Sequence, residues 1–373
     1  MQANTTQPST PPLPTRAGAA RALQLWEILL FVSVATLFSL VGITVLRMLK
    51  RRRSRIAKET GADRRPQPTQ LSNVWEESAA RMKLETGDDI IREVVPTDDP
   101  VVPHRGDEDD PNAKTRAGMA MPRDGRRPVV LVTGGARRVG RAIAEAFAGA
   151  GCDVIITYLS SDAESEETVA ALRKRGVSAG AFRVDLGELD ELDRWAQKLA
   201  DHLPRLDVVV HNASIYEPSP IDEGVVVEAM RHYRINALAP LLLTSRLAPL
   251  LSRSTMEGGG AVVCMSDIHA LGRPRRGYTA YSMSKAALTE MVQSLARELA
   301  PSVRVNAVAP GVVAWPEAGF ESEPAEQRGY VRRIPLGRAG TPEDAARAVR
   351  WLALEATYVT GEVVRVDGGR WLT

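Results

Sequence analysis

The segment Thr133-Gly134-Gly135-Ala136-Arg137-Arg138-Val139-Gly140 decides the fold, because it joins a strand to a helix through a glycine-rich turn. The apolar run PVVLVT leads into it, and a helical pattern over Val139–Ala150 follows it. Glycine lets backbone approach a pyrophosphate, and the unpaired N–H groups at a helix amino terminus attract anions. The segment therefore predicts a dinucleotide site lined by Gly134, Arg137, Arg138, Val139 and Gly140.

Strands and helices alternate from this segment to the end of the chain. The further apolar runs that read as strands are DVIITY, AFRVD, LDVVVHN, GAVVCMS, VRVNAVAP and EVVRVDGG. Helical periodicity lies between them, over Ala163–Arg175, Leu189–His202, Val225–Leu251, Thr279–Ala300 and Pro342–Ala356. This alternation predicts a doubly wound parallel α/β sheet of about seven strands, with helices on both faces and ligands at the carboxyl ends of the strands.

The beginning of the chain reads as a membrane anchor. The run Ile28–Leu46 has no charged residue and, at about 1.5 Å rise per residue, is long enough as a helix to span a hydrocarbon core of about 30 Å. The basic cluster Arg47 through Arg55 follows it, as expected of a retained anchor whose downstream part is cytoplasmic. A buried core helix is the alternative, but no amphipathic neighbour would cover it.

We therefore expect a polar tail over 1–24 and a transmembrane helix over 25–49 that contacts the lipid bilayer. Residues 50–127 are polar, rich in Pro, Asp and Arg, and show little periodicity. Such a composition buries too little apolar surface to offset chain entropy, which predicts a basic juxtamembrane segment and a mostly disordered linker. The catalytic domain over 128–373 would then lie on the cytoplasmic side of the cell membrane, on a single-pass protein.

Composition excludes several other classes of function. A net charge of +2 over 373 residues gives no reason to expect nucleic acid as a partner. The two cysteines, Cys152 and Cys264, supply neither a disulfide framework nor a CxxC zinc pair. The histidines form no metal constellation, so no metal is expected.

The end of the second strand indicates which cofactor is bound. An acidic residue at this place would hydrogen-bond the ribose of NAD and repel a 2′-phosphate. The sequence has Ser160 and Ser161 there, with Arg137 nearby, and these side chains suit the 2′-phosphate of NADP. The sequence therefore favours NADP(H) over NAD.

Tyr281 and Lys285 are the candidate catalytic pair. They lie four residues apart and hence on one face of a helix. A phenol has a pKa near 10, and an ammonium group one turn away is expected to lower that pKa toward the working range. A Tyr-x-x-x-Lys spacing alone is common by chance, so the assignment depends on the motifs around it.

Those motifs occur in the order found in the short-chain dehydrogenases/reductases, a family with a Rossmann-type fold. They are TGGARRVG, Asn212-Ala213-Ser214, Asn236 within a helix, YSMSK, and Ala309-Pro310-Gly311. The resemblance covers essentially everything after the linker, and the motifs are jointly highly specific. It implies a homo-oligomer, a dimer or tetramer, paired through the helices that begin near Val225 and Thr279.

The resemblance also implies a role for each matching residue. Tyr281 would donate the proton, Lys285 would hold the nicotinamide ribose, and Asn236 would support a water relay. Asp185, with Leu186 beside it, would contact the adenine. The residues expected along the rest of the cofactor are Asn212, Ala213, Ser214, Pro310 and Gly311.

Within this family the sequence looks most like the pteridine reductases. Arg138 replaces the middle glycine of the cofactor loop, and Asp267 replaces the usual active-site serine. Tyr216 follows Asn212-Ala213-Ser214 where pteridine reductases stack an aromatic ring on the pterin. The segments Trp315–Glu317 and Asp367–Arg370 also resemble bacterial members. This likeness implies a substrate site formed by Arg138, Tyr216, Asp267, Tyr281 and Trp315.

The position of Asp267 leaves one alternative open. It lies one position further from Tyr281 than the family spacing, which an inserted residue in the loop Leu271–Arg276 would explain. Otherwise Ser266 takes the role of the family's serine, and Asp267 is a displaced surface carboxylate. Residues Trp315 to Val331 follow the Ala-Pro-Gly motif, where related enzymes close a mobile lid over the substrate.

The sequence thus predicts an NADPH-dependent oxidoreductase that transfers a hydride to a C=N carbon of a pteridine-like substrate. Tyr281 and Asp267 would supply protons. The first alternative is a carbonyl substrate, above all a 3-oxoacyl thioester on a carrier protein. An alternative of another class is an NADP-binding sensor or scaffold without turnover, tethered to recruit partners through residues 56–125.

Overall fold

The computed structural model of this chain describes residues 124–273, 275–317 and 320–373. The tail predicted at 1–24, the anchor predicted at 25–49 and nearly all of the linker predicted at 50–127 lie outside the described residues. Within the described ranges, no helix is both long and apolar enough to cross a membrane. The first described residue, Asp124, forms an ion pair with Arg205.

Seven parallel strands form one sheet in the order β3-β2-β1-β4-β5-β6-β7, which confirms the predicted doubly wound architecture. The chain reverses its direction of travel across the sheet between β1 and β4, so the carboxyl ends of these strands flank a crevice. The strands are β1 (Val129–Val132), β2 (Asp153–Tyr158), β3 (Ala179–Arg183), β4 (Val208–His211), β5 (Gly260–Met265), β6 (Val303–Pro310) and β7 (Val363–Val366).

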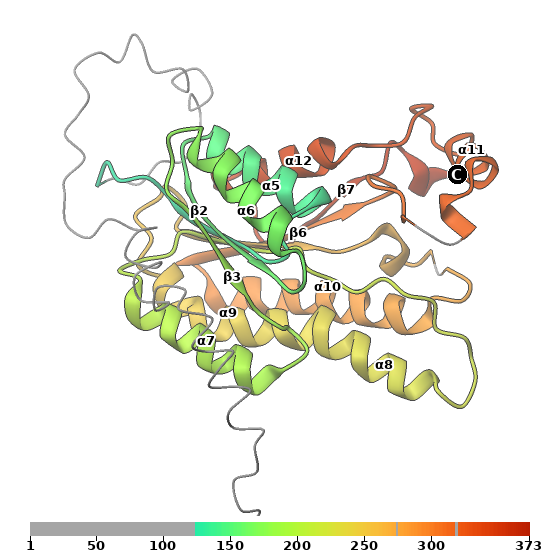
Figure 1. Cartoon of the computed structure of the whole chain (residues 1–373), viewed down its shortest axis with the longest axis horizontal. Helices are drawn as coiled ribbons and strands as arrows, with labels where there is room; N and C mark the ends of the chain where they lie inside the picture. The colour runs from blue at the N-terminus through green and yellow to red at the C-terminus, as the bar shows by residue number, and fades with distance from the viewer. Residues whose placement is uncertain (1–123, 274, 318–319) are drawn as a thin grey trace, which may run out of the picture. The chain divides into compact units, whose positions relative to one another are not determined.

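Helices cover both faces of the sheet, as Figure 1 shows. One face carries α5 (Arg138–Gly149), α6 (Asp162–Arg173) and α12 (Pro342–Leu354), and the other carries α7 (Leu189–His202), α8 (Val225–Tyr233), α9 (Ala239–Leu251) and α10 (Thr279–Leu299). Strand β1 is buried along its whole length because its side chains alternate between two apolar cores, Val130 and Val132 in one and Val129 and Leu131 in the other.

The helix predicted over Val225–Leu251 spans these residues, but it is not a regular α-helix throughout. The structure has α8, then a π-helical segment η1 (Arg234–Leu238), then α9. Pro240 has no N–H to donate to the carbonyl of Asn236, four residues earlier, so a regular α-helix loses a hydrogen bond at this point. Hydrophobic periodicity gives no sign of this lost hydrogen bond. Short π-helical segments inside α-helices are frequent at functional sites.

Short elements complete the fold around the crevice. They are the 3₁₀ turns η2 (Ile268–Ala270), η3 (Phe320–Ser322) and η4 (Arg370–Leu372), and the helix α11 (Pro324–Val331). Both η3 and α11 belong to the segment that was predicted to form a lid after β6. This segment therefore contains short helical elements, and its role as a lid stays a prediction.

Candidate functional site

A cleft of about 700 Å³ lies at the carboxyl ends of the strands. All of the predicted cofactor and substrate residues line this cleft. The predicted catalytic residue Asn236 is buried and is not among the lining residues. These lining residues are Gly134, Arg137, Arg138, Val139, Gly140, Ser160, Ser161, Asp185, Leu186, Asn212, Ala213, Ser214, Tyr216, Asp267, Tyr281, Lys285, Pro310, Gly311 and Trp315. Their individual roles remain predictions.

The turn between β1 and α5 fits a pyrophosphate. Gly134 has a φ of 63°, and a Cβ there would come within 3.0 Å of Ala213. A Cβ at Gly140 would lie 1.9 Å from the carbonyl oxygen of Gly134, so only glycine permits this closeness. No side chain caps the amino terminus of α5, and its first turn holds no acidic residue. Its N–H groups and dipole are therefore suited to an anion.

Arg138 occupies a strained backbone conformation at this turn. Its φ of 52° is the only positive value for a non-glycine residue in the described parts of the chain. Its Nη2 donates to the carbonyl oxygen of Trp315 at 2.7 Å. The guanidinium groups of Arg137 and Arg138 approach one carboxylate oxygen of Glu317, at 3.6 and 3.7 Å. The two guanidinium groups thus lie near the same carboxylate, that of Glu317.

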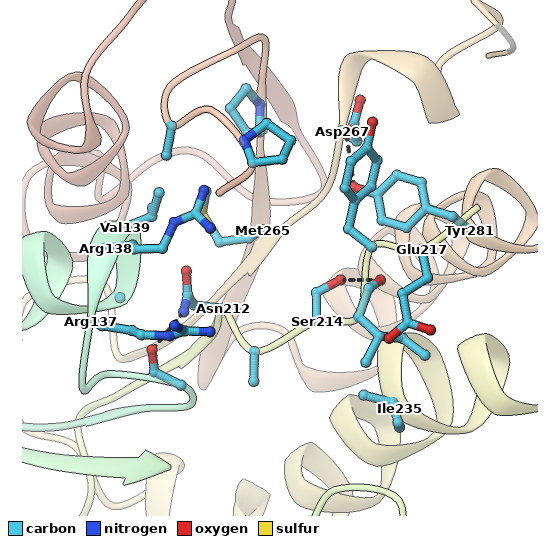
Figure 2. A pocket seen from close by; sticks show the side chains of 18 of the residues that line it. Arg137, Arg138, Val139, Asn212, Ser214, Glu217, Ile235, Met265, Asp267 and Tyr281 are labelled. Atoms are coloured by element: carbon cyan, nitrogen blue, oxygen red, sulfur yellow. Dashed lines mark hydrogen bonds between the residues drawn. The ribbon is translucent and has the colours of Figure 1, made fainter. Parts of the chain in front are cut away.

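The reacting end of the cleft is formed by Asp267 and the pair on α10. The Tyr281 hydroxyl donates to Oδ2 of Asp267 at 2.8 Å. Lys285 Nζ lies 5.9 Å from the centre of the Tyr281 ring and donates to the carbonyl oxygen of Met265 at 2.7 Å. Figure 2 shows Asp267 and Tyr281 on the opposite side of the cleft from the arginines of the glycine turn.

The expectation that Lys285 lowers the pKa of Tyr281 is wrong for this structure. Burial, and then the adjacent Asp267 carboxylate, raise the pKa of Tyr281 well above its ordinary value. The Lys285 ammonium bonds a backbone carbonyl instead of the phenol, and burial lowers the pKa of Lys285 to about 8. Tyr281 is therefore protonated at neutral pH, the state that a proton donor needs.

Hydrogen bonds favour Asp267 over Ser266 as the partner of Tyr281. The Ser266 hydroxyl shares a hydrogen bond of 2.7 Å with the hydroxyl of Thr289 on α10, and Ser266 is buried. Asp267 caps η2, where its Oδ1 accepts the N–H of His269 at 2.7 Å and leaves Oδ2 for Tyr281. The placement of an inserted residue in the loop Leu271–Arg276 stays a prediction.

Asn236 fixes the loop after β4 to α10. Its Oδ1 accepts the N–H of Ile215 at 3.0 Å and the hydroxyl of Ser214 at 3.1 Å. Its Nδ2 donates to the carbonyl of Ile215 at 3.0 Å and to the Ser284 hydroxyl at 2.9 Å. Because these bonds occupy the amide, the side chain positions the cleft wall, and its part in a water relay remains a prediction.

Tyr216 stands beside Tyr281, as an aromatic wall of the cleft. Its ring meets the Tyr281 ring edge-on at 4.8 Å and stacks on Tyr278, with centres 4.6 Å apart and planes at 17°. Its hydroxyl donates to Oε2 of Glu321 at 2.9 Å. Tyr278 therefore covers one face of the ring that was predicted to stack on a substrate.

The lining residues that were not singled out from the sequence include three with charged or aromatic side chains at the reacting end, Arg275, Glu321 and Tyr330. Arg275 forms an ion pair with Glu321, and its guanidinium carbon lies 5.8 Å from the centre of the Tyr216 ring. Glu321 and Tyr330 belong to the segment after β6. The available signal was the presence of charged and aromatic side chains in a segment expected to cover the substrate.

Comparisons with known proteins agree with this geometry. The family model described as enoyl-(acyl carrier protein) reductase matches residues 134–370. A 3-oxoacyl-[acyl-carrier-protein] reductase of Aquifex aeolicus is 34% identical over 243 residues, covering 65% of this chain and 96% of the relative. The 3beta-hydroxysteroid dehydrogenase 1 of Eggerthella lenta is 32% identical, covering 65% and 93%. The crystal structure of an acetoin dehydrogenase from Salmonella typhimurium superposes with a TM-score of 0.59 at 29% identity, covering 66% and 97%.

Proposed function

Because this chain is an oxidoreductase of the short-chain dehydrogenase/reductase family, we propose that it reduces a C=N bond of a pteridine-like ring with NADPH. The observation that carries the proposal is the 2.8 Å hydrogen bond from Tyr281 to Asp267. A carboxylate accepts from ring N–H groups, and a carboxylic acid donates to a ring nitrogen. Asp267 therefore suits a nitrogen-rich ring better than a serine hydroxyl does.

The residues of the cleft fit NADP(H), which when bound supplies a hydride. Gly134 and the amino terminus of α5 would hold the pyrophosphate, and Lys285 would hold the nicotinamide ribose. Arg137, with Ser160 and Ser161, would hold the 2′-phosphate. Fluorescence titration should give a lower Kd for NADPH than for NADH, and Arg137→Glu should reverse this preference. Equal affinities in the wild type would refute the choice of NADP.

The chain's own residues supply the proton of this reaction. When hydride adds to the carbon of the C=N bond, the π electron pair moves to nitrogen, which takes one proton. Tyr281 gives that proton and is reprotonated through Asp267 and solvent. A phenol whose pKa is raised donates only to a stronger base, and the nitrogen anion that develops on hydride addition is such a base.

Turnover of purified protein tests the substrate. NADPH consumption is measured with dihydrobiopterin, for the wild type and for Asp267→Ser. We expect turnover by the wild type and a loss of about 100-fold or more in the variant, the usual scale for a proton-transfer group. Oxidation of NADPH with an acetoacetyl thioester alone would remove the pteridine assignment.

A second candidate function is reduction of a 3-oxoacyl thioester. It is favoured by the relatives, since carrier-protein reductases of Aquifex and Synechocystis are among them. In this reaction the proton goes from Tyr281 to the carbonyl oxygen, and Asp267 has no ring nitrogen to contact. Asp267→Ser should then leave thioester reduction within a fewfold of wild type or improve it, the opposite of the pteridine outcome.

We also propose that the catalytic domain pairs with a second copy through α8 and α10. Val226, Val227 and Met230 of α8 and Met283 of α10 are 68%, 69%, 56% and 60% exposed. Apolar side chains gathered on two packed helices are typical of an interface. Light scattering of residues 121–373 should show a dimer or tetramer, and Val227→Glu should shift it toward monomer. A monomeric wild type would contradict the proposal.

The sequence supports a further proposal, that residues 25–49 anchor the enzyme to the cell membrane with the catalytic domain on the cytoplasmic side. The uncharged run Ile28–Leu46 and the basic cluster after it motivate the proposal. Cell fractionation followed by an alkaline wash should leave the full chain in the membrane pellet. Its release into the supernatant would refute the anchor.

A further inference from the structure

The turn η2 brings two polar residues to the cleft, Asp267 just before the turn and His269 within it. Ile268, which lies between them, is 1% exposed and belongs to the apolar core. The Asp-Ile-His order thus places one apolar side chain inward and leaves the two polar residues at the cleft. Oδ1 of Asp267 accepts the backbone N–H of His269 at 2.7 Å, which holds the two residues in a fixed relation.

The imidazole of His269 is oriented by a hydrogen bond of 2.8 Å between its Nδ1 and the backbone carbonyl oxygen of Arg273. A carbonyl oxygen only accepts hydrogen bonds, so Nδ1 carries the proton, and Nε2 of the neutral ring is an acceptor. Among the residues that the structure describes, none donates a hydrogen bond to Nε2, and Nε2 is not one of the buried side-chain atoms that lack a partner. His269 is half-buried and lines the cleft, so it offers the cleft an acceptor of fixed direction.

The loop that orients this imidazole is attached to the end of the chain. The Arg273 guanidinium donates to the backbone carbonyl oxygens of Arg370 and Thr373, which lie 97 and 100 positions further along. Of the described residues that line the cleft, Arg273 is not one. Arg273 is therefore a positioning residue, which acts on the cleft through the His269 ring.

The acceptor on His269 differs from the two carboxylates at the reacting end, because these already have partners. Oδ2 of Asp267 accepts the Tyr281 hydroxyl, and Glu321 forms an ion pair with Arg275. A substrate with an N–H group in its reacting part can bond Nε2 of His269. A substrate without a donor leaves that nitrogen without a partner once water is displaced, which costs free energy.

We propose that His269 determines substrate specificity by accepting, through Nε2, a hydrogen bond from an N–H group of the substrate ring. The assignment rests on the proposed function for the identity of that ring. Pteridines with an amino-substituted pyrimidine ring carry N–H donors on the ring and on the exocyclic amine, whereas the oxoacyl group of a thioester carries none. The proposal narrows the substrate class to pteridines that retain these N–H groups.

Steady-state kinetics with NADPH and dihydrobiopterin test this assignment. His269→Leu should raise KM about tenfold, the scale of one lost hydrogen bond, and change kcat less than about threefold, because Tyr281 and Asp267 remain. His269→Gln keeps an acceptor oxygen on a side chain of similar reach and should recover most of the loss. Thermal unfolding and the Kd for NADPH, both expected to match the wild type, check that the variants are folded. An equal KM in wild type and His269→Leu would overturn the proposal.

A double-mutant cycle tests the positioning role of Arg273. Arg273→Gln should raise KM about threefold and add little to His269→Leu, because its effect passes through the imidazole. Arg276→Gln removes the same charge from an exposed residue of the same loop and should behave as wild type. Effects of Arg273→Gln and His269→Leu that simply add would contradict this role.

Nitrogen NMR separates the proposal from the assigned reaction. The five histidine side chains are labelled, and the His269 signals are those that disappear in His269→Gln. We expect the Nδ1–H tautomer in the ligand-free protein and an upfield shift of Nε2 when biopterin is added with NADP⁺, two oxidised molecules that do not react together. If the shift appears but no pteridine is reduced, the proposed function fails and the acceptor site stands. Reduction of dihydrobiopterin without this shift, or an Nε2–H tautomer, would refute the role of His269 and leave the reaction in place.

Discussion

The two ends of the cleft are built in different ways. The glycine turn holds its features within one short segment, Thr133–Gly140, between β1 and α5. The reacting end combines Asp267 after β5, Tyr281 and Lys285 on α10, and Tyr216 after β4. The first end depends on local backbone geometry, and the second depends on how distant segments pack.

This difference separates binding from chemistry. The glycine turn needs open N–H groups and close backbone approach, which glycines provide wherever a strand leads into a helix. The reacting end needs side-chain atoms at hydrogen-bond distance, and these distances come from the buried contacts of α10 with β5 and β6. Changes at one end should therefore affect one property and spare the other.

Tyr281→Phe should have the largest effect, confined to the reacting end. Removing the hydroxyl deletes the proton donor and its bond to Asp267, so kcat should fall about 10³-fold, within the range for general acid catalysis. The Kd for NADPH should change less than about threefold, because the contacts that bind the cofactor before the reaction remain. Rapid-mixing kinetics and fluorescence titration measure the two values. Loss of NADPH binding in this variant would contradict the claim that the two ends of the cleft affect separate properties.

Gly140→Ala should damage the other end. The added Cβ would lie 1.9 Å from the carbonyl oxygen of Gly134, so the turn must open. We expect NADPH affinity to fall about 100-fold, equivalent to roughly 3 kcal/mol of strain and lost contacts. Gly149→Ala is the matched control in the same helix, since its nearest neighbour would be 3.5 Å away. Similar affinities for both variants would contradict the close approach.

The pKa of Lys285 predicts the alkaline limb of activity. Burial lowers this pKa to about 8, so Lys285 is protonated below that pH and loses its charge as the pH rises through it. If the ammonium form is needed at the reacting end, kcat/KM falls about tenfold per pH unit above this point. The NADPH-dependent rate is measured across the alkaline range, with Lys285→Met as the control that lacks the limb. A wild-type profile that stays flat to about pH 10 would sink this assignment.

Ser266→Ala should have the smallest effect. The Ser266 hydroxyl shares a hydrogen bond with Thr289, whereas the Tyr281 hydroxyl donates to Asp267. We expect kcat/KM to change less than about threefold, with a loss of stability of about 1 kcal/mol for one buried hydrogen bond. Steady-state kinetics and thermal unfolding give the two quantities. A fall in kcat comparable with that of Tyr281→Phe would restore Ser266 as the proton-handling residue.

Much of the fold could be predicted from patterns in the chain. Buried strands such as Val129–Val132 appear as continuous apolar runs because both faces of a parallel sheet are covered. The π-helical segment around Asn236 could not be predicted from periodicity, since the apolar pattern of α8 and α9 continues on both sides of it. The pKa direction of Tyr281 also escaped prediction, because it depends on burial and on Asp267, a residue from another segment.

The sequence by itself determined the glycine turn, the order of strands and helices, and the Tyr281–Lys285 spacing on one helix face. All three depend on neighbours in the chain, whose backbone geometry is set locally. Only the tertiary structure decided that Asp267 and not Ser266 meets Tyr281, and that Arg333 and Arg370 lie beside the Tyr330 ring. These contacts join residues far apart in sequence, and packing fixes their distances.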